Sequence, residues 1–569
     1  MMLGLADENT AFILDKVEGN KKLTNTGKPT WSSLVNLTDF SMKGLDAATN
    51  PFCAAGMTLG NGTYIVVGGN KAVSYGGGTP QGGDTGPYAP YHDQDGRRVV
   101  RIMEPADNSG DLQWIDQYNS PNQMDSERWY PGIEGLADGS VVIIGGATSG
   151  GYINRNYPNV DPVYETTTPN PPDGNWAQGG ANPSYEFWPP TNKPQPAKSQ
   201  FMIKTSGLNM YPHTYLMPSG KIFMQANYST TLWDPYGNTE EDLPDMPGQI
   251  VRVYPASAAT AMLPLTPANN YTPTILFCGG STASDEQWGN YTAPNINMYQ
   301  HSANTECHSI TPEKSDGSAA DNVDYVHEED LPEGRSMGQF IILPNGKLWF
   351  GNGIATGTAG YTNNPNQAGQ PVGNSFGDNP VLNHYLYDPS KPAGQRWSHV
   401  GRARVGRLYH SSATLLPDSS ILISGSNPNM DYTDNEKWNT EYRVERWYPD
   451  FYNQDRPSAK GLPNQFHYGG KGFTINLNNA NEANNAKVVL IRTGFSTHAM
   501  NMGQRMIELR SKAEGSQLHV AQMPNNPNLF APGPALAFVV VNGVPSHGKF
   551  VTVGNGQIGN QPTHDNTSL

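Results

Sequence analysis

The chain has 569 residues, including 62 Gly and 47 Pro, and only 15% of them are charged, against about 25% in ordinary globular domains. Its 11 Trp, 28 Tyr and 17 Phe exclude an intrinsically disordered chain, and it has too few Ala, Leu, Glu and Lys runs for a helical bundle. A net charge of −15 and the absence of an apolar run of ~18 residues argue against nucleic acid, anionic lipid and the membrane interior as partners.

One pattern recurs along the chain: an apolar strand that follows a tight turn and often ends in Gly, as in T-Y-I-V-V-G-G at 63–69. The seven copies begin at Thr10, Thr63, Ser140, Lys221, Thr274, Lys347 and Ser420. Such Gly-Gly endings resemble kelch repeats, and seven copies predict an all-β fold with a seven-bladed β-propeller at 1–455. The alternative is a large β-sandwich in which the turns coincide by chance.

After the last copy, a polar segment that contains Pro runs from 446 to 463 and indicates a linker. Short runs of alternating hydrophobicity follow it at 472–477, 486–492, 506–509 and 535–541. They predict a separate β-sandwich at 456–569. No segment predicts a helix of ordinary length.

Common catalytic motifs are absent: the sequence has no Walker loop, no H-E-x-x-H, no G-x-S-x-G and no C-x-x-C. Tyr and His instead precede the repeats at similar distances. Tyr130 comes 10 residues before Ser140, and Tyr409 comes 11 before Ser420, with His410 next to it. Equivalent positions of different blades meet near the axis of a propeller, so these residues could converge. On spacing alone, packing of Tyr and His at the blade ends is the better explanation.

Six further segments occur in order over nearly the whole chain. They are P-F-C-A-A-G at 51–56, R-W-Y-P at 128–131, N-P-S-Y-E-F-W-P-P at 182–190, R-L-Y-H-S at 407–411, G-F-S-T-H-A-M-N-M-G-Q-R at 494–505 and A-P-G-P-A at 531–535. Together they resemble the copper radical oxidases, and glyoxal oxidase more closely than galactose oxidase. The resemblance implies a seven-bladed propeller followed by an immunoglobulin-like domain that supplies one copper ligand.

The resemblance also implies a role for individual residues. Cys53 and Tyr130 match a pair joined by a thioether crosslink, which serves as a built-in radical cofactor. Tyr409 matches an axial tyrosine, and His410 and His498 match two imidazole ligands. The implied ligands of one copper ion are Tyr130, Tyr409, His410 and His498, and the catalytic residues are Cys53, Tyr130 and Tyr409.

The chemistry of these residue types suits that assignment. Two imidazoles with oxygen donors suit Cu(II), and the charge of a metal lowers the pKa of a phenol bound to it. The sulfur of Cys53 would make the one-electron oxidation of Tyr130 easier, and Tyr409 would act as the general base. If Cys53 is used in this way, Cys278 and Cys307 can form a disulfide that closes a loop of about 30 residues and contributes about 3–4 kcal/mol. The alternative is two free buried thiols.

The sequence departs from galactose oxidase at one position. In that enzyme a tryptophan covers the crosslinked tyrosine, whereas the corresponding segment here, G-G-A-T-S-G-G from 145, places Thr148 there. We therefore expect a different residue to cover Tyr130. His213 and His384 also precede strands, and we interpret them as structural or as contacts on the substrate side.

The predicted function is a secreted oxidase that converts small aldehydes such as glyoxal or methylglyoxal, as hydrates, to carboxylic acids while reducing O₂ to H₂O₂. The alternatives are an alcohol oxidase of the same chemistry and a non-catalytic kelch propeller that binds carbohydrate or protein. We expect a glycosylated monomer whose peroxide extracellular peroxidases could use, with the leader peptide absent from this numbering. The acceptor sequons begin at Asn36, Asn61, Asn227, Asn270, Asn290 and Asn566.

Overall fold

The computed structural model describes residues 1–17, 19–105, 112–148, 181–205, 207–284, 287–288, 297–362 and 373–566. Almost all regular structure in these residues is β-strand, as the composition predicts. The described helices are the short α3 (Gln200–Lys204) and α4 (Ala480–Asn484), with three 3₁₀ turns, η1 (Tyr75–Gly77), η2 (Pro247–Gln249) and η3 (Met298–Gln300). None of the described helices is both long and apolar enough to cross a membrane.

Seven antiparallel sheets follow one another in the described part of the chain up to Trp447, and we number them in that order. Sheet 1 contains β1 (Met2–Leu5), β2 (Thr10–Leu14), β3 (Ser32–Asn36) and β4 (Met42–Gly44). Sheet 2 contains β5 (Ala55–Thr58), β6 (Tyr64–Val67) and β7 (Val100–Met103). Sheet 3 contains β8 (Gly132–Gly135), β9 (Val141–Ile144), β10 (Ser184–Trp188) and β11 (Ala197–Lys198). Sheet 4 contains β12 (His213–Leu216), β13 (Ile222–Ala226), β14 (Ser229–Asp234) and β15 (Thr239–Leu243). Sheet 5 contains β16 (Ala259–Met262), β17 (Ile275–Cys278), β18 (Cys307–Ile310) and β19 (Tyr325–His327). Sheet 6 contains β20 (Gln339–Ile342), β21 (Leu348–Gly351), β24 (Asn383–Tyr387) and β25 (Trp397–Arg402). Sheet 7 contains β26 (Ser411–Leu415), β27 (Ile421–Gly425) and β28 (Glu445–Trp447). A separate hairpin consists of β22 (Ile354–Tyr361) and β23 (Ser375–Pro380).

Each predicted repeat forms the second strand of one sheet, namely β2, β6, β9, β13, β17, β21 and β27. Six of these seven strands are buried at every position, which explains their continuous apolar sequences. The preceding turns are also formed as predicted: the side chain of Asp138 accepts a hydrogen bond from the Ser140 amide at 3.1 Å, and Gly139 has a φ of 77°. The repeats are therefore confirmed as strands, whereas closure of the seven sheets into a propeller stays a prediction.

The C-terminal region contains its own sheets. One consists of β29 (Gln465–Phe466), β40 (Lys549–Val553), β38 (Gly533–Val541), β32 (Ala486–Arg492) and β35 (Arg505–Glu508), with β39 (Val544–Pro545) on β38. The others are β31 (Phe473–Asn476), β37 (Gln517–Val520) and β36 (Ser511–Glu514), and the pair β30 (Tyr468–Gly470) and β41 (Thr563–Asn566). All four predicted C-terminal runs lie on these strands.

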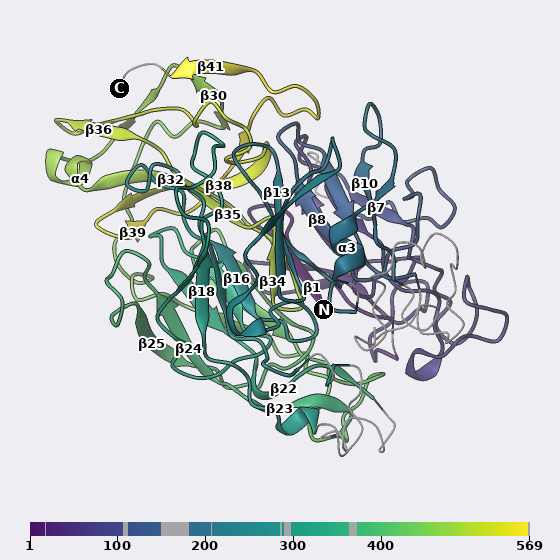
Figure 1. Cartoon of the computed structure of the whole chain (residues 1–569). Helices are drawn as coiled ribbons and strands as arrows, with labels where there is room; N and C mark the ends of the chain where they lie inside the picture. Colours follow the sequence, from purple (N-terminus) through teal and green to yellow (C-terminus); the bar gives the residue numbers. More distant parts are fainter. Residues whose placement is uncertain are drawn as a thin grey trace.

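One C-terminal hairpin leaves this region and joins the first sheet. Strands β33 (Phe495–Thr497) and β34 (Met500–Met502) extend sheet 1 in the order β34-β33-β1-β2-β3-β4, and Leu3 pairs with Ser496. Figure 1 shows β34 in the same part of the molecule as β1, far from β36 and β41 at the C-terminal end. The Gln339 side chain donates to Ser496 Oγ at 2.6 Å and ties the hairpin to sheet 6. The predicted boundary between 455 and 456 stays a prediction, and this hairpin contributes its strands to the preceding region.

Candidate metal centre

The five residues singled out in the sequence meet in the interior. None of them is more than 4% exposed. Four lie in the segments just before the first strands of sheets 2, 3 and 7, and the fifth lies in the turn between β33 and β34. They are Cys53, Tyr130, Tyr409, His410 and His498. The fold therefore brings together every candidate of the predicted copper site.

A repeated R-x-Y motif positions the two tyrosines. Arg128 and Arg407 are each at most 1% exposed, and each donates through Nη1 to the carbonyl at the end of the second strand of its own sheet, Gly145 at 2.8 Å and Gly425 at 2.6 Å. Arg128 also bonds to the Glu186 carboxylate at 2.9 Å. Because the guanidinium is fixed inside the sheet, the tyrosine two residues later is held at the point where the first strand begins.

The backbone at these positions is unusual. Cys53, Tyr130, His410 and His498 have φ values of 58°, 58°, 66° and 50°, in the left-handed region that non-glycine residues seldom adopt. Each such residue costs on the order of 1–3 kcal/mol unless its surroundings fix it. Here the Tyr130 amide donates to the Cys53 carbonyl at 3.0 Å, so the two strained turns support one another.

The polar atoms of the site lie within hydrogen-bond range. The hydroxyls of Tyr130 and Tyr409 are 2.8 Å apart, and His498 Nε2 lies 3.2 Å from the Tyr409 hydroxyl and 3.4 Å from Cys53 Sγ. Cys53, His410 and His498 each offer one possible donor atom, and these three atoms all lie within 4.8 Å of one another. Two imidazoles, two phenols and one thiol therefore share one small space.

The partners of the two histidines leave the same ring nitrogen available in each. His410 donates from Nδ1 to the Asn427 carbonyl at 2.9 Å, and its buried Nε2 has no hydrogen-bond partner among the described residues. His498 Nδ1 lies 2.6 Å from the Thr497 hydroxyl, which itself donates to the Met1 carbonyl at 3.4 Å. Thr497 thus accepts the Nδ1 proton, and the Nε2 lone pair of His498 faces the site.

Burial keeps all these groups neutral. It lowers the pKa of His410 and His498 well below the usual value, with nearby positive charge adding to the effect. It raises the pKa of Tyr130 and Tyr409 well above 10, and it raises the pKa of the Cys53 thiol. A bound cation would reverse this preference for the tyrosines, because its charge stabilises phenolates.

The residues fit a copper ion on the chemistry of their donors. An unpartnered, buried imidazole nitrogen is costly unless something fills its place, and His410 Nε2 is such an atom. Two imidazole nitrogens with two phenolic oxygens form the N,O donor set that Cu(II) prefers in tetragonal sites. The carbonyl and hydroxyl partners on Nδ1 are those typical of metal-binding histidines.

Comparison with known proteins agrees with this geometry. The family described as Glyoxal oxidase N-terminus matches residues 159–451, which is more than half of the chain. The chain belongs to the glyoxal oxidase family. The family described as Galactose oxidase-like, Early set domain matches residues 456–553.

Relatives within the glyoxal oxidase family align over most of the chain. Aldehyde oxidase GLOX1 of Arabidopsis thaliana is 26% identical over 552 residues, which cover 92% of this chain and 74% of the relative. Aldehyde oxidase GLOX of Vitis pseudoreticulata is 25% identical, with 91% and 85% covered. A solved structure of a fungal alcohol oxidase of the AA5 family, in complex with copper, has a TM-score of 0.64 at 16% identity and covers 97% of this chain and 96% of its own. The predictions of family and enzyme class, a copper radical oxidase of the glyoxal oxidase type, are confirmed, and the fold resembles that of the AA5 enzyme.

Other sequence predictions have separate outcomes. The disulfide between Cys278 and Cys307 is confirmed, and it joins directly opposed residues of β17 and β18. Cys53 is a free buried cysteine, so the crosslink stays a prediction. His213 donates from Nε2 to the Arg252 carbonyl at 3.1 Å, and His384 packs on Trp349 at 5.0 Å, which favours the structural interpretation of both.

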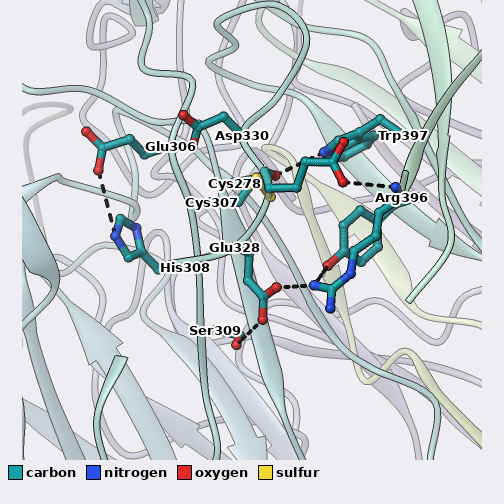
Figure 2. The surroundings of a disulfide bond; sticks show 12 residues. Cys278, Glu306, Cys307, His308, Ser309, Glu328, Asp330, Arg396 and Trp397 are labelled. Atoms are coloured by element: carbon teal, nitrogen blue, oxygen red, sulfur yellow. Dashed lines mark hydrogen bonds and ion pairs between the residues drawn. A yellow bond between two sulfur atoms is a disulfide. The ribbon is translucent and has the colours of Figure 1, made fainter. Parts of the chain in front are cut away.

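A second cluster of possible metal donors, Glu306, His308 and His327, lies in sheet 5. Figure 2 shows Glu306 and His308 on the same side of the disulfide, joined by a dashed line. Arg252 donates to His308 Nδ1 at 2.8 Å, so a neutral His308 carries its proton on Nε2, the nitrogen 3.7 Å from the Glu306 carboxylate. No lone pair of His308 is then available, and we assign no metal to this cluster.

The site contains further aromatic residues that the sequence motifs did not predict. Tyr211 and Tyr254 contact the ring of Tyr130 at 5.1 and 4.7 Å, and Tyr361 contacts His410 at 6.2 Å. One signal was present for Tyr254: R-V-Y-P at 252–255 repeats R-W-Y-P at 128–131. Arg97 Nη1 donates to the Thr148 carbonyl at 2.5 Å. The position that carries the covering tryptophan in galactose oxidase therefore has no aromatic ring in this chain.

Proposed function

We propose that this protein oxidises small aldehydes, as their hydrates, to carboxylic acids and reduces O₂ to H₂O₂. The observation that carries the proposal is the convergence of Tyr130, Tyr409, His410 and His498 around Cys53 in a buried pocket of N and O donors. Names of relatives support the aldehyde class, because two of them are aldehyde oxidases. The overall reaction is RCH(OH)₂ + O₂ → RCOOH + H₂O₂, in which two electrons and two protons pass from the hydrate to O₂.

In this proposal His410 Nε2, His498 Nε2 and the hydroxyl oxygens of Tyr130 and Tyr409 hold one copper ion. Bound copper would supply one oxidising equivalent and the positive charge that stabilises phenolates near neutral pH. Asn427 and Thr497 keep the two imidazoles in the required tautomer and orientation through their Nδ1 contacts.

The second oxidising equivalent would reside on Tyr130. Its crosslink to Cys53 forms as Cys–SH + H–C(Tyr) + O₂ → Cys–S–C(Tyr) + H₂O₂, so the thiol and ring each lose one hydrogen. The sulfur then donates electron density to the ring and eases its oxidation. Tyr409, as a phenolate, accepts the hydroxyl proton of the hydrate at its oxygen. Its position 2.8 Å from the Tyr130 hydroxyl places the base next to the oxidisable ring.

An alcohol is the second candidate substrate class. A galactose oxidase of Gibberella zeae is 25% identical over 517 residues, covering 88% of this chain and 60% of its own. Loss of a hydroxyl proton and a carbon-bound hydrogen is common to an alcohol and an aldehyde hydrate, so the same residues serve both.

Two measurements test the proposal. Peptide mapping after exposure to copper and O₂ should show Cys53 joined to Tyr130 with the loss of two hydrogen atoms. A peroxide-release assay should cover glyoxal, methylglyoxal, glycolaldehyde, glycerol, galactose and benzylic alcohols, and we expect the aldehydes to react fastest. A free Cys53 thiol in copper-loaded, oxygen-exposed protein would exclude the radical cofactor.

We also infer an extracellular location and closure of the seven sheets into a propeller around this site. A buried disulfide suits an oxidising compartment, and the sequon residues Asn36, Asn61 and Asn270 are exposed. Asn227 is buried, and Asn290 and the side chain of Asn566 lie outside the described residues. Glycan analysis of the protein from its native host tests the first inference.

A further inference from the structure

A third copy of the R-x-Y motif brings another phenol to the site. Arg252 is completely buried, and its Nη1 donates to the carbonyl of Gly279, which directly follows the second strand of sheet 5. Arg128 and Arg407 make the equivalent contact in sheets 3 and 7. Tyr254 is therefore the structural counterpart of Tyr130 and Tyr409, although no metal-ligand role is predicted for it.

The ring of Tyr254 lies over Tyr130. Their centroids are 4.7 Å apart and their planes differ by 33°, within the range of favourable offset pairs. Tyr211 and His498 meet Tyr130 at 68° and 72°, which is edge-to-face. Among the described contacts of Tyr130, Tyr254 is the nearest ring and the one closest to parallel.

The hydroxyl of Tyr254 reaches the other tyrosine. Tyr409 donates to it at 3.4 Å, and the Tyr254 ring also contacts the ring of His498 at 5.8 Å. Tyr254 is only 6% exposed, so these contacts exclude water from that side of the site. One side chain thus touches three of the four proposed ligands.

The segment that carries Tyr254 is firmly held. Arg252 donates to the Glu306 carbonyl and to His308 Nδ1, both at 2.8 Å, and these residues flank the disulfide-bonded Cys307. Figure 2 shows Glu306 and His308 next to the disulfide. On the other side the Pro255 carbonyl accepts from the Ala359 amide at 3.0 Å.

We propose that Tyr254 is a positioning residue that covers the oxidisable ring of Tyr130 and orients the phenolic oxygen of Tyr409. An electron-rich ring at 4.7 Å and a tilt of 33° shields an oxidised phenol from solvent and from external reductants, and it restricts the plane in which that phenol lies. The inference rests on the proposed radical function. It identifies the cover over Tyr130 that the sequence, with Thr148 in the corresponding loop, leaves unassigned.

The test compares copper-loaded, oxidised variants by the decay of their radical absorption and by electron paramagnetic resonance. Tyr254→Met removes the ring at similar volume, and Tyr254→Phe removes only the hydroxyl. Tyr325→Met and Tyr325→Phe are the matched controls, because Tyr325 is a buried tyrosine of the same sheet whose hydroxyl contacts Thr230 at 2.7 Å.

We expect the half-life of the oxidised form to fall about tenfold in Tyr254→Met, the factor that loss of a strong ring pair produces. Tyr254→Phe should keep the half-life and lower kcat about fivefold, as loss of one hydrogen bond does. Both Tyr325 variants should match the parent in half-life and kcat.

Each outcome is decisive. An unchanged half-life in folded Tyr254→Met overturns the shielding role, and an unchanged kcat in Tyr254→Phe overturns the orienting role, while the proposed function stands in both cases. Tyr254→Leu replaces the methionine variant if that variant lacks a cooperative melting transition. A parent protein that forms no radical with copper and oxidant overturns the proposed function, and this inference with it.

Discussion

The hydroxyl groups of Tyr130 and Tyr409 lie 2.8 Å apart, although 279 positions separate the two residues. Each sits directly before the first strand of its own sheet, two residues after a buried arginine. This pair of equivalent positions produces the site, and the histidines complete it.

Replacing His498 with alanine should weaken copper binding at least about 100-fold. This loss is larger than that expected for a residue that only hydrogen-bonds to a copper ligand, because His498 is itself a proposed ligand. The reason is that His498 Nε2 faces both the Tyr409 hydroxyl and Cys53 Sγ, so no other imidazole can take its place. Titration with copper followed by metal analysis measures the change. His384→Ala, which removes a buried histidine that packs on Trp349, is the control and should retain full copper stoichiometry. Equal affinity of His498→Ala and the parent would remove His498 from the ligand set.

Much of this arrangement follows from local sequence. The second strand of every sheet is an apolar run, usually bounded by a turn, and burial on both faces demands that pattern. The disulfide could be expected once Cys53 had another role. The strands and turns can be predicted from residues that are close in sequence, and the disulfide from one pair of cysteines.

The rest depends on long-range packing that local sequence does not encode. The hairpin of β33 and β34 joins sheet 1 at the single pair Leu3 and Ser496, so only the family resemblance identified His498. Tyr254 was missed because it lies five residues before β16, whereas Tyr130 lies two before β8. Ring orientation, which gives Tyr254 its significance, has no sequence signal.

Replacing Thr497 with valine should lower copper affinity about 10–100-fold and leave the fold intact. Valine has nearly the same shape but cannot accept the Nδ1 proton of His498, so the imidazole loses its fixed tautomer. Competition titration against a copper chelator gives the Kd. Thr414→Val is the matched control, because the buried hydroxyl of Thr414 has no partner among the described residues. A Thr497→Val protein with parental affinity would show that this contact does not orient the ligand.

Removing both Cys278 and Cys307 as alanines should lower the free energy of unfolding by about 3–4 kcal/mol in the chain-entropy account of a loop of this length. The bridge spans 29 positions and joins opposed residues at one end of β17 and β18, the two middle strands of sheet 5. Denaturation with guanidinium measures the loss, and the reduced parent should match the double variant. Identical midpoints for the oxidised parent and the double variant would mean that the bridge adds no stability.

Glu134 is a buried residue of β8 that is 6% exposed. Burial raises its pKa from 4.5 to about 7, although Arg505 opposes the shift. The folded protein therefore keeps a proton on Glu134 at pH values where the unfolded chain has lost it. The contribution of this group to stability is fully present below pH 4.5 and is lost as pH rises to about 7.

Glu134→Gln should remove about 3 kcal/mol of the fall in unfolding free energy between pH 4.5 and 8, because glutamine does not titrate. Urea denaturation at both pH values measures this difference directly. Glu514→Gln changes an exposed glutamate of β36 and should keep the pH profile of the parent. The prediction is wrong if Glu134→Gln and the parent lose the same stability across this range, since the buried carboxyl would then ionise as readily in the folded protein as in the unfolded chain.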